Sequence, residues 1–304
     1  MFFMRRNLET WRTVGRIARD ILNVGTKLVK PGAKIFEICE KIENITRDMG
    51  YNPAFPVNIG INSVAAHYTA VPYDPSRIPN VALVKLDIGV LSADGAIADT
   101  AITIPINVNK KLKLLVEATR CALEKAIDAI KDGIRVGEIG SIIWKTAHSE
   151  GFGVLEDLGG HTLSEWKLHG GITIPNVPRR FTPKLRAGMI VAIEPFLVAS
   201  SEDSHTKLNM AQINIYSIKN PYDDRVLELL YRRFRSLPFA LRWLERAKTD
   251  KRFYSSMHGY LMRRYMEGKV IVYPTLIEAH NNWVAQFEHT VLVKTNSAEI
   301  LTGE

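Results

Sequence analysis

The chain has 304 residues, of which 46% are hydrophobic and 24% are charged. At roughly 100–200 residues per domain this length allows one large domain or two small ones, and the composition excludes a disordered chain, a collagen-like chain and a disulfide scaffold. The two cysteines, Cys39 and Cys121, form no CxxC motif and are typical of a reducing compartment. No apolar run reaches about 18 residues and the N-terminus lacks the features of a secretory signal, so we expect a cytoplasmic protein without a membrane span.

Two stretches of sequence resemble each other at an offset of 101 residues, Gly32–Ile38 and Gly133–Ile139. Each leads into a helical pattern that ends at a glycine, Gly50 or Gly151, which is a signal for a helix C-terminus. Another long helix precedes each stretch, and strand-like runs follow it. This order predicts an internal duplication with a pocket between two pseudo-symmetric halves; chance similarity of two amphipathic helices is the simpler alternative. The preceding helices span about Leu8–Val29 and Lys110–Lys131.

A basic excess is concentrated in one segment. Tyr231–Lys269 contains eleven Lys or Arg residues and three acidic ones, so its excess equals the formal net charge of +8 of the whole chain. The pattern there is helical, with a break at Pro238, and it interrupts the strands of the second half as an insertion would. Because its arginines are interleaved with aromatic residues, the segment is compatible with nucleic-acid binding. An amphipathic helical insertion with a solvated basic face is the ordinary alternative.

Three strand-like apolar runs each contain one acidic residue in the middle: Asp87, Glu194 and Glu288. An unpaired ionised carboxylate in an apolar core is costly, and pairing, metal binding or protonation relieves the cost. One such residue would fit a structural salt bridge, but three of them, with Asp99 in another apolar run, indicate a shared cation. The predicted strands are Phe55–Ile61, Val81–Val90, Ile97–Ile106, Met189–Val198, Leu208–Ser217 and Trp283–Lys294.

The two aspartates are also related by geometry. Asp94-Gly95 between them is a turn signal. In a hairpin centred near Ala93, positions 87 and 99 lie directly opposite each other on one face, with Cβ atoms ~5 Å apart. Like charges that close repel each other unless a counter-ion binds both. A solvent-facing pair fits poorly, because the neighbouring residues are apolar.

His161 follows Gly159-Gly160, where the backbone can run close to a site, and neutral imidazole is a common ligand of transition metals. On its own it would more often be an ordinary loop histidine. With four carboxylates it completes a donor set that suits a pair of divalent ions better than one tetrahedral structural zinc.

At these residues the sequence closely resembles the type 2 methionine aminopeptidases, in their archaeal form, and the resemblance covers nearly the whole chain. Each matching fragment alone would be weak, but all of them occur in the order of the family. The fragments are Phe55–Gly60, Ala66–Thr69, Lys85–Gly89, Asp94–Ala101, Gly160–His161, Lys167–Ile172, Ala192–Phe196 and Gln286–Thr290.

The resemblance implies an α/β (α+β) pita-bread fold, in which two pseudo-symmetric helix–helix–strand halves surround a central antiparallel sheet. It implies a single catalytic domain over residues 1–304, with a type 2 helical insertion subdomain at about 202–280. The duplication inferred from the repeat alone agrees with this fold.

The resemblance also implies a metal site. Two divalent ions (Co, Mn, Fe or Zn) would be held by Asp87, Asp99, His161, Glu194 and Glu288, and Asp99 and Glu288 would bridge both ions. The two aspartates lie one position further apart here than is usual in the family. We expect this to change only the hairpin tip at Leu91–Ala93.

The implied activity is removal of the N-terminal methionine from peptides and nascent proteins by a water molecule that the ions activate. Glu194 would bind metal and shuttle the proton between this water and the leaving amine. His67 would contact the scissile carbonyl, and His169 the peptide beyond it. His289 and Thr290 either orient the ligands or have ordinary strand roles. The walls of the methionine pocket would be Phe55, Pro56, Leu168 and Phe196.

Two other functions fit parts of the sequence. A non-catalytic protein of this fold could bind RNA or the ribosome through Tyr231–Lys269, although no metal ligand is missing here; ribosome contact could also accompany catalysis. A proline-specific peptidase of the same fold usually carries a sizeable additional N-terminal domain, for which this chain has no room. We expect a monomer whose substrates are peptides and nascent chains that begin with methionine.

Overall fold

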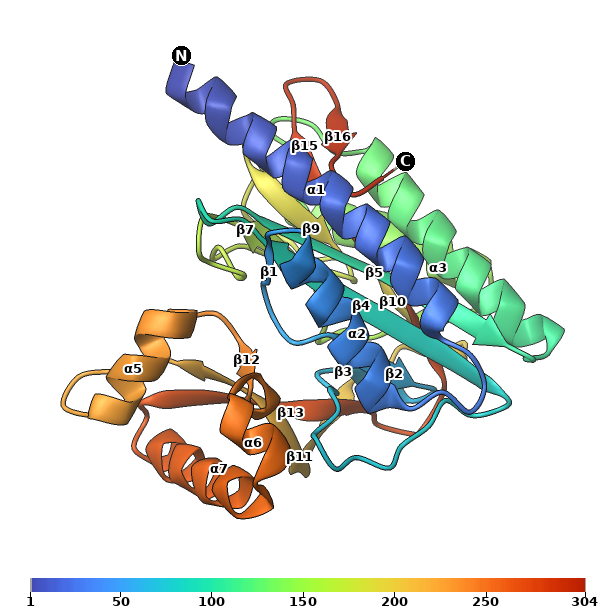
Figure 1. The fold of residues 1–304 in the computed structure, drawn as a ribbon. Helices are drawn as coiled ribbons and strands as arrows, with labels where there is room; N and C mark the ends of the chain where they lie inside the picture. Colours follow the sequence, from blue (N-terminus) through green and yellow to red (C-terminus); the bar gives the residue numbers. More distant parts are fainter. Residues whose placement is uncertain (1, 304) are drawn as a thin grey trace.

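The computed structural model describes residues 2–303 (Figure 1). The helices are α1 (Phe2–Leu28), α2 (Ile35–Asp48), α3 (Lys110–Asp128), α4 (Val136–Ser149), α5 (Arg225–Phe234), α6 (Glu245–Thr249) and α7 (Lys251–Met266), with a 3-10 turn η1 (Leu241–Trp243). The strands are β1 (Asn52–Pro53), β2 (Asn58–Ile61), β3 (Val64–Ala66), β4 (Ala82–Leu91), β5 (Ile97–Ile106), β6 (Gly153–Val154), β7 (Gly159–Leu163), β8 (Thr173–Pro175), β9 (Ile190–Ile193), β10 (Phe196–Val198), β11 (Thr206–Ile218), β12 (Phe239–Ala240), β13 (Val270–Glu278), β14 (Val284–Gln286), β15 (His289–Val293) and β16 (Ala298–Ile300).

The two halves follow the repeat in the sequence. Helices α2 and α4 are each 14 residues long, and their first residues, Ile35 and Val136, are 101 positions apart. The glycines after these helices, Gly50 and Gly151, have φ of +84° and +79°, which residues with a Cβ rarely adopt. Helices α1 and α2 pack with β4 and β5 in one core, and α3 and α4 pack with β9 and β15 in a second core. The predicted duplication is therefore confirmed.

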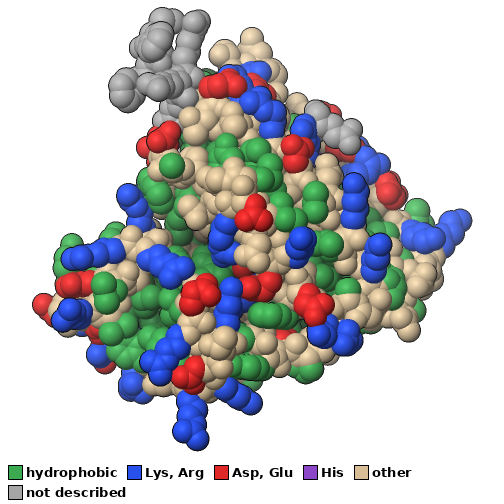
Figure 2. All heavy atoms as spheres, viewed as in Figure 1, with side chains coloured by type: hydrophobic (Ala, Val, Ile, Leu, Met, Phe, Trp, Pro, Cys, Tyr) green, Lys and Arg blue, Asp and Glu red, His purple; other side chains and the backbone are tan. Residues whose placement is uncertain are grey.

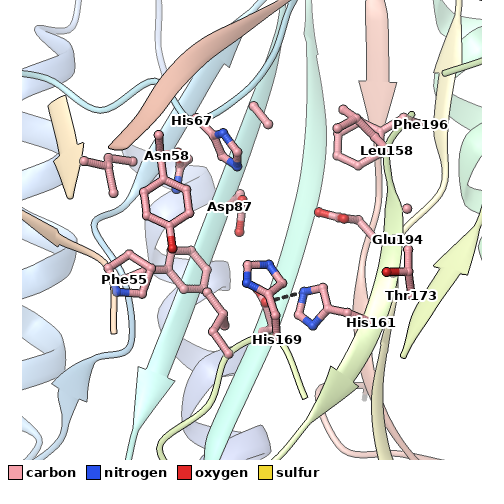
Figure 3. A pocket seen from close by; sticks show the side chains of 18 of the residues that line it. Phe55, Asn58, His67, Asp87, Leu158, His161, His169, Thr173, Glu194 and Phe196 are labelled. Carbon is pink, nitrogen blue, oxygen red and sulfur yellow. Dashed lines mark ion pairs between the residues drawn. The ribbon is translucent and has the colours of Figure 1, made fainter. Parts of the chain in front are cut away.

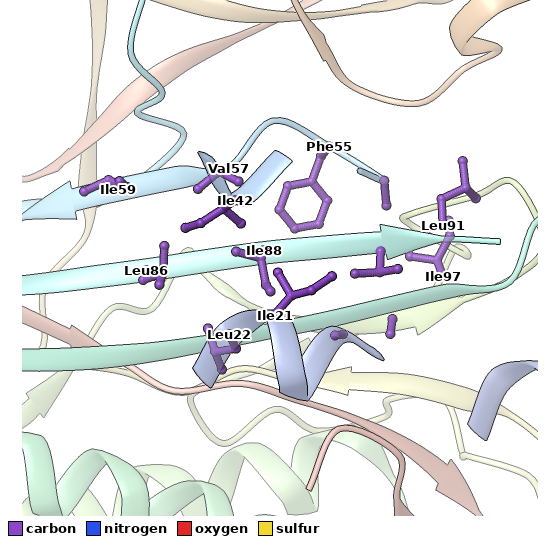
Figure 4. Close-up of a cluster of buried hydrophobic side chains, with 14 of the residues drawn as sticks. Ile21, Leu22, Ile42, Phe55, Val57, Ile59, Leu86, Ile88, Leu91 and Ile97 are labelled. Carbon is purple, nitrogen blue, oxygen red and sulfur yellow. The ribbon is translucent and has the colours of Figure 1, made fainter. Parts of the chain in front are cut away.

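Periodic apolar residues explain how the helices attach to the strands. Trp11, Val14, Ala18 and Ile21 recur every three or four residues along α1 and are almost fully buried. Figure 4 shows Ile21 packed beside Ile88 of β4 in this core. Burial of each large aliphatic side chain contributes roughly 1.5–3 kcal/mol. Figure 1 shows α1 and α3 side by side, crossing the strands on the same face of the molecule.

The strands form antiparallel sheets that meet at the middle of the molecule. One sheet contains β1, β4, β2 and β5, and a second contains β16, β15, β9, β7 and β8. A short sheet of β14, β10 and β6 continues from the second, and a sheet of β12, β11, β13 and β3 supports helices α5 to α7. Hydrogen bonds between Ala101 and Glu288 join the first sheet to the chain between β14 and β15.

Two predicted strands are interrupted at their acidic residues. The run Met189–Val198 divides into β9 and β10 at Glu194-Pro195, because proline has no N–H to continue the ladder. The run Trp283–Lys294 divides into β14 and β15, because the backbone of Glu288 turns to bond with Ala101. The prediction of Glu194 and Glu288 in mid-strand was therefore wrong, and both residues lie where the chain changes sheets.

The hairpin of β4 and β5 has a different register from the expected one. Asp99 lies opposite Gly89, and Asp87 lies opposite Ala101, so the two aspartates are diagonal neighbours. The turn is centred on Asp94 because the Ser92 hydroxyl accepts a hydrogen bond from the Ala96 amide, 3.0 Å away. The prediction that Asp87 and Asp99 lie directly opposite each other was thus wrong. The shift is an even number of residues, which keeps both carboxylates on one face.

The predicted insertion, residues 202–280, packs around a hydrophobic cluster of its own. Its helical pattern breaks near Pro238, as expected, and the chain there forms β12 and η1 between α5 and α6. Figure 1 shows α5, α6 and α7 gathered at one end of the molecule, on β11 and β13. None of the helices in the described part of the chain is long and apolar enough to cross a membrane.

The end of the chain is joined to α1 by ion pairs. Glu299 on β16 accepts a hydrogen bond from Arg12 Nε (2.7 Å) and forms an ion pair with Lys294 Nζ (2.8 Å). These contacts lower the pKa of the Glu299 carboxyl to about 2. The ionised form is therefore favoured in the folded protein relative to the unfolded chain.

We expect Glu299→Gln to lower the free energy of unfolding at pH 7 by about 1 kcal/mol, because the pair is partly exposed. The depressed pKa contributes stability above the unfolded value of about 4.3, and this contribution is lost as the pH falls toward about 2. Urea unfolding of both proteins at pH 7 and pH 3 measures the difference. An equal difference in the free energy of unfolding between the two proteins at pH 7 and at pH 3 would contradict the lowered pKa of Glu299.

Candidate metal centre

Five predicted ligands converge from both halves of the fold. Asp87 lies on β4, Asp99 on β5 and His161 on β7, whereas Glu194 and Glu288 occupy the breaks before β10 and β15. Ligand atoms of Asp99, His161 and Glu288 lie within 4.8 Å of one another, and so do those of Asp87, Glu194 and Glu288. Figure 3 shows Asp87, Glu194 and His161 around a common space. Glu288 belongs to both groups, while the bridging role expected of Asp99 stays a prediction.

Several oxygens in this cluster lack the partners that buried carboxylates require. Asp87 Oδ1, Asp99 Oδ1 and both carboxylate oxygens of Glu288 are buried without a hydrogen-bond partner among the described residues. Burial raises the pKa of Asp87 to about 7. Burial and the neighbouring carboxylates raise the pKa values of Asp99, Glu194 and Glu288 well above their ordinary range. Divalent cations bound here would offset the repulsion between the carboxylates and would give the unpartnered oxygens a ligand contact.

The donor set fits such cations. Carboxylate oxygens are hard ligands, and one imidazole among them is compatible with Mn, Fe, Co or Zn. His161 Nε2 lies 3.6 Å from Asp99 Oδ2, and burial lowers the pKa of the ring to about 3. The imidazole is therefore neutral at pH 7, as a metal ligand must be.

Neighbouring groups hold these side chains in place. Gln286 Nε2 donates to Glu194 Oε1 (2.9 Å), and the Thr290 hydroxyl bonds to the main chain of Asp99. His289 instead contacts Thr302 Oγ1, at 2.9 Å. Of the two possible orienting residues, Thr290 thus bonds through its hydroxyl to a predicted ligand residue, whereas the side chain of His289 bonds to Thr302. Gln286 was missed, although a lone amide in an apolar strand next to Glu288 was a usable signal.

A cavity of about 280 Å³ opens beside the cluster. Three predicted wall residues, Phe55, Leu168 and Phe196, line it. Pro56 is not among the residues that line this cavity, and its carbonyl accepts a hydrogen bond from Asn58 Nδ2 (2.9 Å); its place in a methionine pocket stays a prediction. Further lining residues flank the predicted ones in sequence or come from distant segments, which a local pattern could not reveal. The flanking residues include Asn58 and Leu158, and the distant ones are Thr173, Ile215, Pro238 and Tyr273.

The two predicted substrate histidines both line the cavity. His67 has φ of +63°, an uncommon backbone conformation for a residue with a side chain, and its ring meets Tyr273 edge-on at 5.5 Å. Burial lowers its pKa to about 4, so it is neutral at pH 7, and its buried Nδ1 has no partner among the described residues. His169 lies edge-on to His161, at 4.5 Å between ring centroids. Figure 3 places both histidines near Asp87.

Comparison with known proteins agrees with this geometry. Residues 9–295 match the metallopeptidase family M24. The methionine aminopeptidase of Saccharolobus solfataricus is 37% identical over 95% of both chains, and that of Methanothermobacter thermautotrophicus is 36% identical over 98% of this chain and 100% of its own. The crystal structure of the Rickettsia prowazekii methionine aminopeptidase has the same fold, with a TM-score of 0.72, 22% identity and 98% of each chain covered. The chain therefore belongs to metallopeptidase family M24.

Proposed function

We propose that this protein removes the N-terminal methionine from peptides and nascent proteins in a metal-dependent hydrolysis. The observation that carries this function is the convergence of four carboxylates and one imidazole beside an apolar cavity. The names of relatives that match nearly the whole chain support the choice of substrate. We assign two divalent ions to Asp87, Asp99, His161, Glu194 and Glu288.

When bound, a pair of divalent ions would supply Lewis acidity to a water molecule and to the substrate carbonyl. Glu194 moves a proton from the attacking water to the leaving amine, because it lies at the cluster and one of its oxygens is held by Gln286. His67 contacts the scissile peptide group through its unpartnered Nδ1, and His169 contacts the peptide beyond it. These roles position the substrate without a charge on either ring.

The cavity walls select the methionine side chain. Phe55, Leu168 and Phe196 present apolar surface next to the predicted metal ligands. Apolar fit discriminates by only about 1–3 kcal/mol per methylene group, so selection against leucine depends on the depth and shape of the cavity. Bound at the predicted metal cluster, the free amine of the substrate would restrict cleavage to the first residue.

The basic segment Tyr231–Lys269 is proposed as a contact to the ribosome, where nascent substrates emerge. Arg242 is fully buried and does not contribute to this surface. The number of basic side chains on the surface is therefore smaller than the number counted in the sequence. Figure 2 shows Lys and Arg side chains over this end of the molecule. The exposed ones are Arg232, Arg233, Arg235, Arg246, Lys251, Arg252 and Arg263.

We further propose that residues 202–280 form an inserted subdomain of one catalytic domain and that the protein acts as a monomer. The cavity supports this, since a single chain supplies its lining. Both cysteines are free thiols, as expected for a protein that works in the cytoplasm.

A peptide assay tests the activity. We expect chelated protein to release no methionine from Met-Ala-Ser and to regain release when Co, Mn, Fe or Zn is added. Xaa-Pro peptides are the control substrates, because a proline-specific peptidase of this fold would prefer them. Cleavage of Xaa-Pro peptides without release of methionine would overturn the proposed substrate.

Metal content tests the ligands within the same experiment. Glu288 belongs to both groups of ligand atoms, whereas His161 belongs to one. We expect Glu288→Gln to lose both ions and His161→Ala to lose one, measured as bound metal per chain. Two retained ions in the Glu288 variant would contradict the assignment.

Replacement of His67 separates substrate positioning from metal binding. We expect His67→Ala to keep its metal content and to lose roughly 10²-fold in kcat, the usual cost of one preorganised polar contact to the reacting group. Turnover of Met-Ala-Ser and metal per chain are measured on the same sample. Unchanged turnover would remove His67 from the mechanism.

Salt dependence tests the basic surface. Phosphate contacts predict that affinity for purified ribosomes falls steeply between 50 and 200 mM salt, by about 10³-fold for six contacts. Arg252→Glu with Arg263→Glu is expected to flatten this dependence. The matched control, Lys110→Glu with Lys113→Glu on α3, changes the net charge equally and is expected to leave it intact. Equal effects of both pairs would argue against a specific surface.

A further inference from the structure

The predicted insertion reaches the rest of the protein through a buried arginine. Arg242, on η1, is only 1% exposed, and arginine is rarely buried so completely unless it is paired. Its Nη2 donates to the carboxylate of Glu43 on α2, and its Nε lies 3.5 Å from Glu40 Oε1. Trp243, the next residue, donates its Nε1–H to the other oxygen of Glu43, at 2.6 Å.

The remaining donor of Arg242 holds the segment that follows His67. Its Nη1 donates to Thr69 Oγ1 (2.8 Å) and to the Ala70 carbonyl (2.9 Å). The Thr69 hydroxyl in turn donates to the Val57 carbonyl (2.7 Å), and the Val57 amide donates to Glu43 (3.0 Å). One buried network thus holds both polar groups of Val57 and the loop two residues beyond His67.

This loop requires support from outside. His67 has a positive φ, and such a conformation costs of order 1–3 kcal/mol unless the surroundings impose it. The strand β3 ends at Ala66, so the ladder does not hold His67 to Ala70. Besides the network, the Ile59 amide donates to the Tyr68 carbonyl at 2.8 Å, and Asn214 Nδ2 donates to the Thr69 carbonyl at 2.8 Å.

Stability alone does not account for such a pair. A buried ion pair can often be replaced by packed apolar residues at no net cost. An apolar residue at position 242 would seal the same interface, but it could not donate to Thr69 Oγ1 and the Ala70 carbonyl. What Arg242 provides, and an apolar residue would not, is therefore the pair of hydrogen bonds that positions the loop after His67.

We propose that Arg242 and Glu43 are positioning residues for the reaction: their buried pair sets the backbone that carries His67, and so makes the predicted insertion part of the catalytic apparatus. This inference rests on the proposed function. It concerns residues that touch neither the ions nor the substrate.

The main variant neutralises both partners, Arg242→Met with Glu43→Gln, so that no lone charge stays buried. We expect kcat for Met-Ala-Ser to fall by about 10–100-fold, as for a catalytic group misplaced by a fraction of an ångström to one ångström, with bound metal unchanged. Thr69→Val removes only the hydroxyl of the network and is expected to lower kcat in the same direction; it carries the test if the double variant does not fold. Arg120→Met with Glu117→Gln, an exposed pair on α3, is the matched control and is expected to keep full activity.

A double-mutant cycle distinguishes positioning from general destabilisation. If the network acts through His67, its variants lose no further activity in a His67→Ala background. Full additivity of the two losses would overturn the proposal.

Hydrogen–deuterium exchange on the metal-free protein gives a readout that does not need activity. Peptides covering residues 55–59 and 67–71 are expected to exchange faster in the network variants, while peptides from α3 and α4 keep their rates. Unchanged exchange at 55–59 and 67–71, or a uniform increase across the chain, would overturn the proposal. Faster local exchange in a protein that releases no methionine before mutation would refute the proposed function and leave the loop support in place.

Discussion

The accumulation of negative charge in one buried place is the constraint on which the rest of this structure depends. Four carboxylates meet at the junction of two sheets, and three of them, Asp87, Asp99 and Glu288, have buried oxygens without a partner among the described residues. Burial raises the pKa values of all four, and the neighbouring carboxylates raise those of Asp99, Glu194 and Glu288 further, so the charged forms are disfavoured unless a counter-ion binds. A bound pair of divalent cations would stabilise the charged carboxylates, so metal binding and the stability of the surrounding fold would be coupled.

The duplicated scaffold brings these groups together by contributing to the site from both sides. The first half supplies Asp87 and Asp99 from adjacent strands, and the second supplies His161, Glu194 and Glu288. Breaks in the second half's strands at the two glutamates are part of this arrangement, since a residue that leaves one ladder before joining another can turn its side chain toward the junction.

The predicted insertion supports the cavity at two places. Arg242 reaches the loop of His67 from one side. On the other, Arg235 at the end of α5 lies over the ring of Trp166, 3.9 Å from its centroid, in the loop that carries Leu168 and His169. Both predicted substrate histidines thus lie on segments that contact the predicted insertion. The exposed arginines and the buried Arg242 of the same segment have different surroundings, which a count of charges cannot distinguish.

By itself the sequence determined the two halves, the strand Ile97–Ile106 to the residue, and the residue types that must share a cation. These properties follow from local periodicity and from the cost of burying a charge, which depends on little beyond neighbouring residues. Only the tertiary structure decided the diagonal register of Asp87 and Asp99, the absence of Pro56 from the cavity lining and the part played by Gln286. It alone turned Arg242 from a surface charge into a buried contact with Glu43, because that bond joins residues 199 positions apart, whose meeting no local pattern encodes.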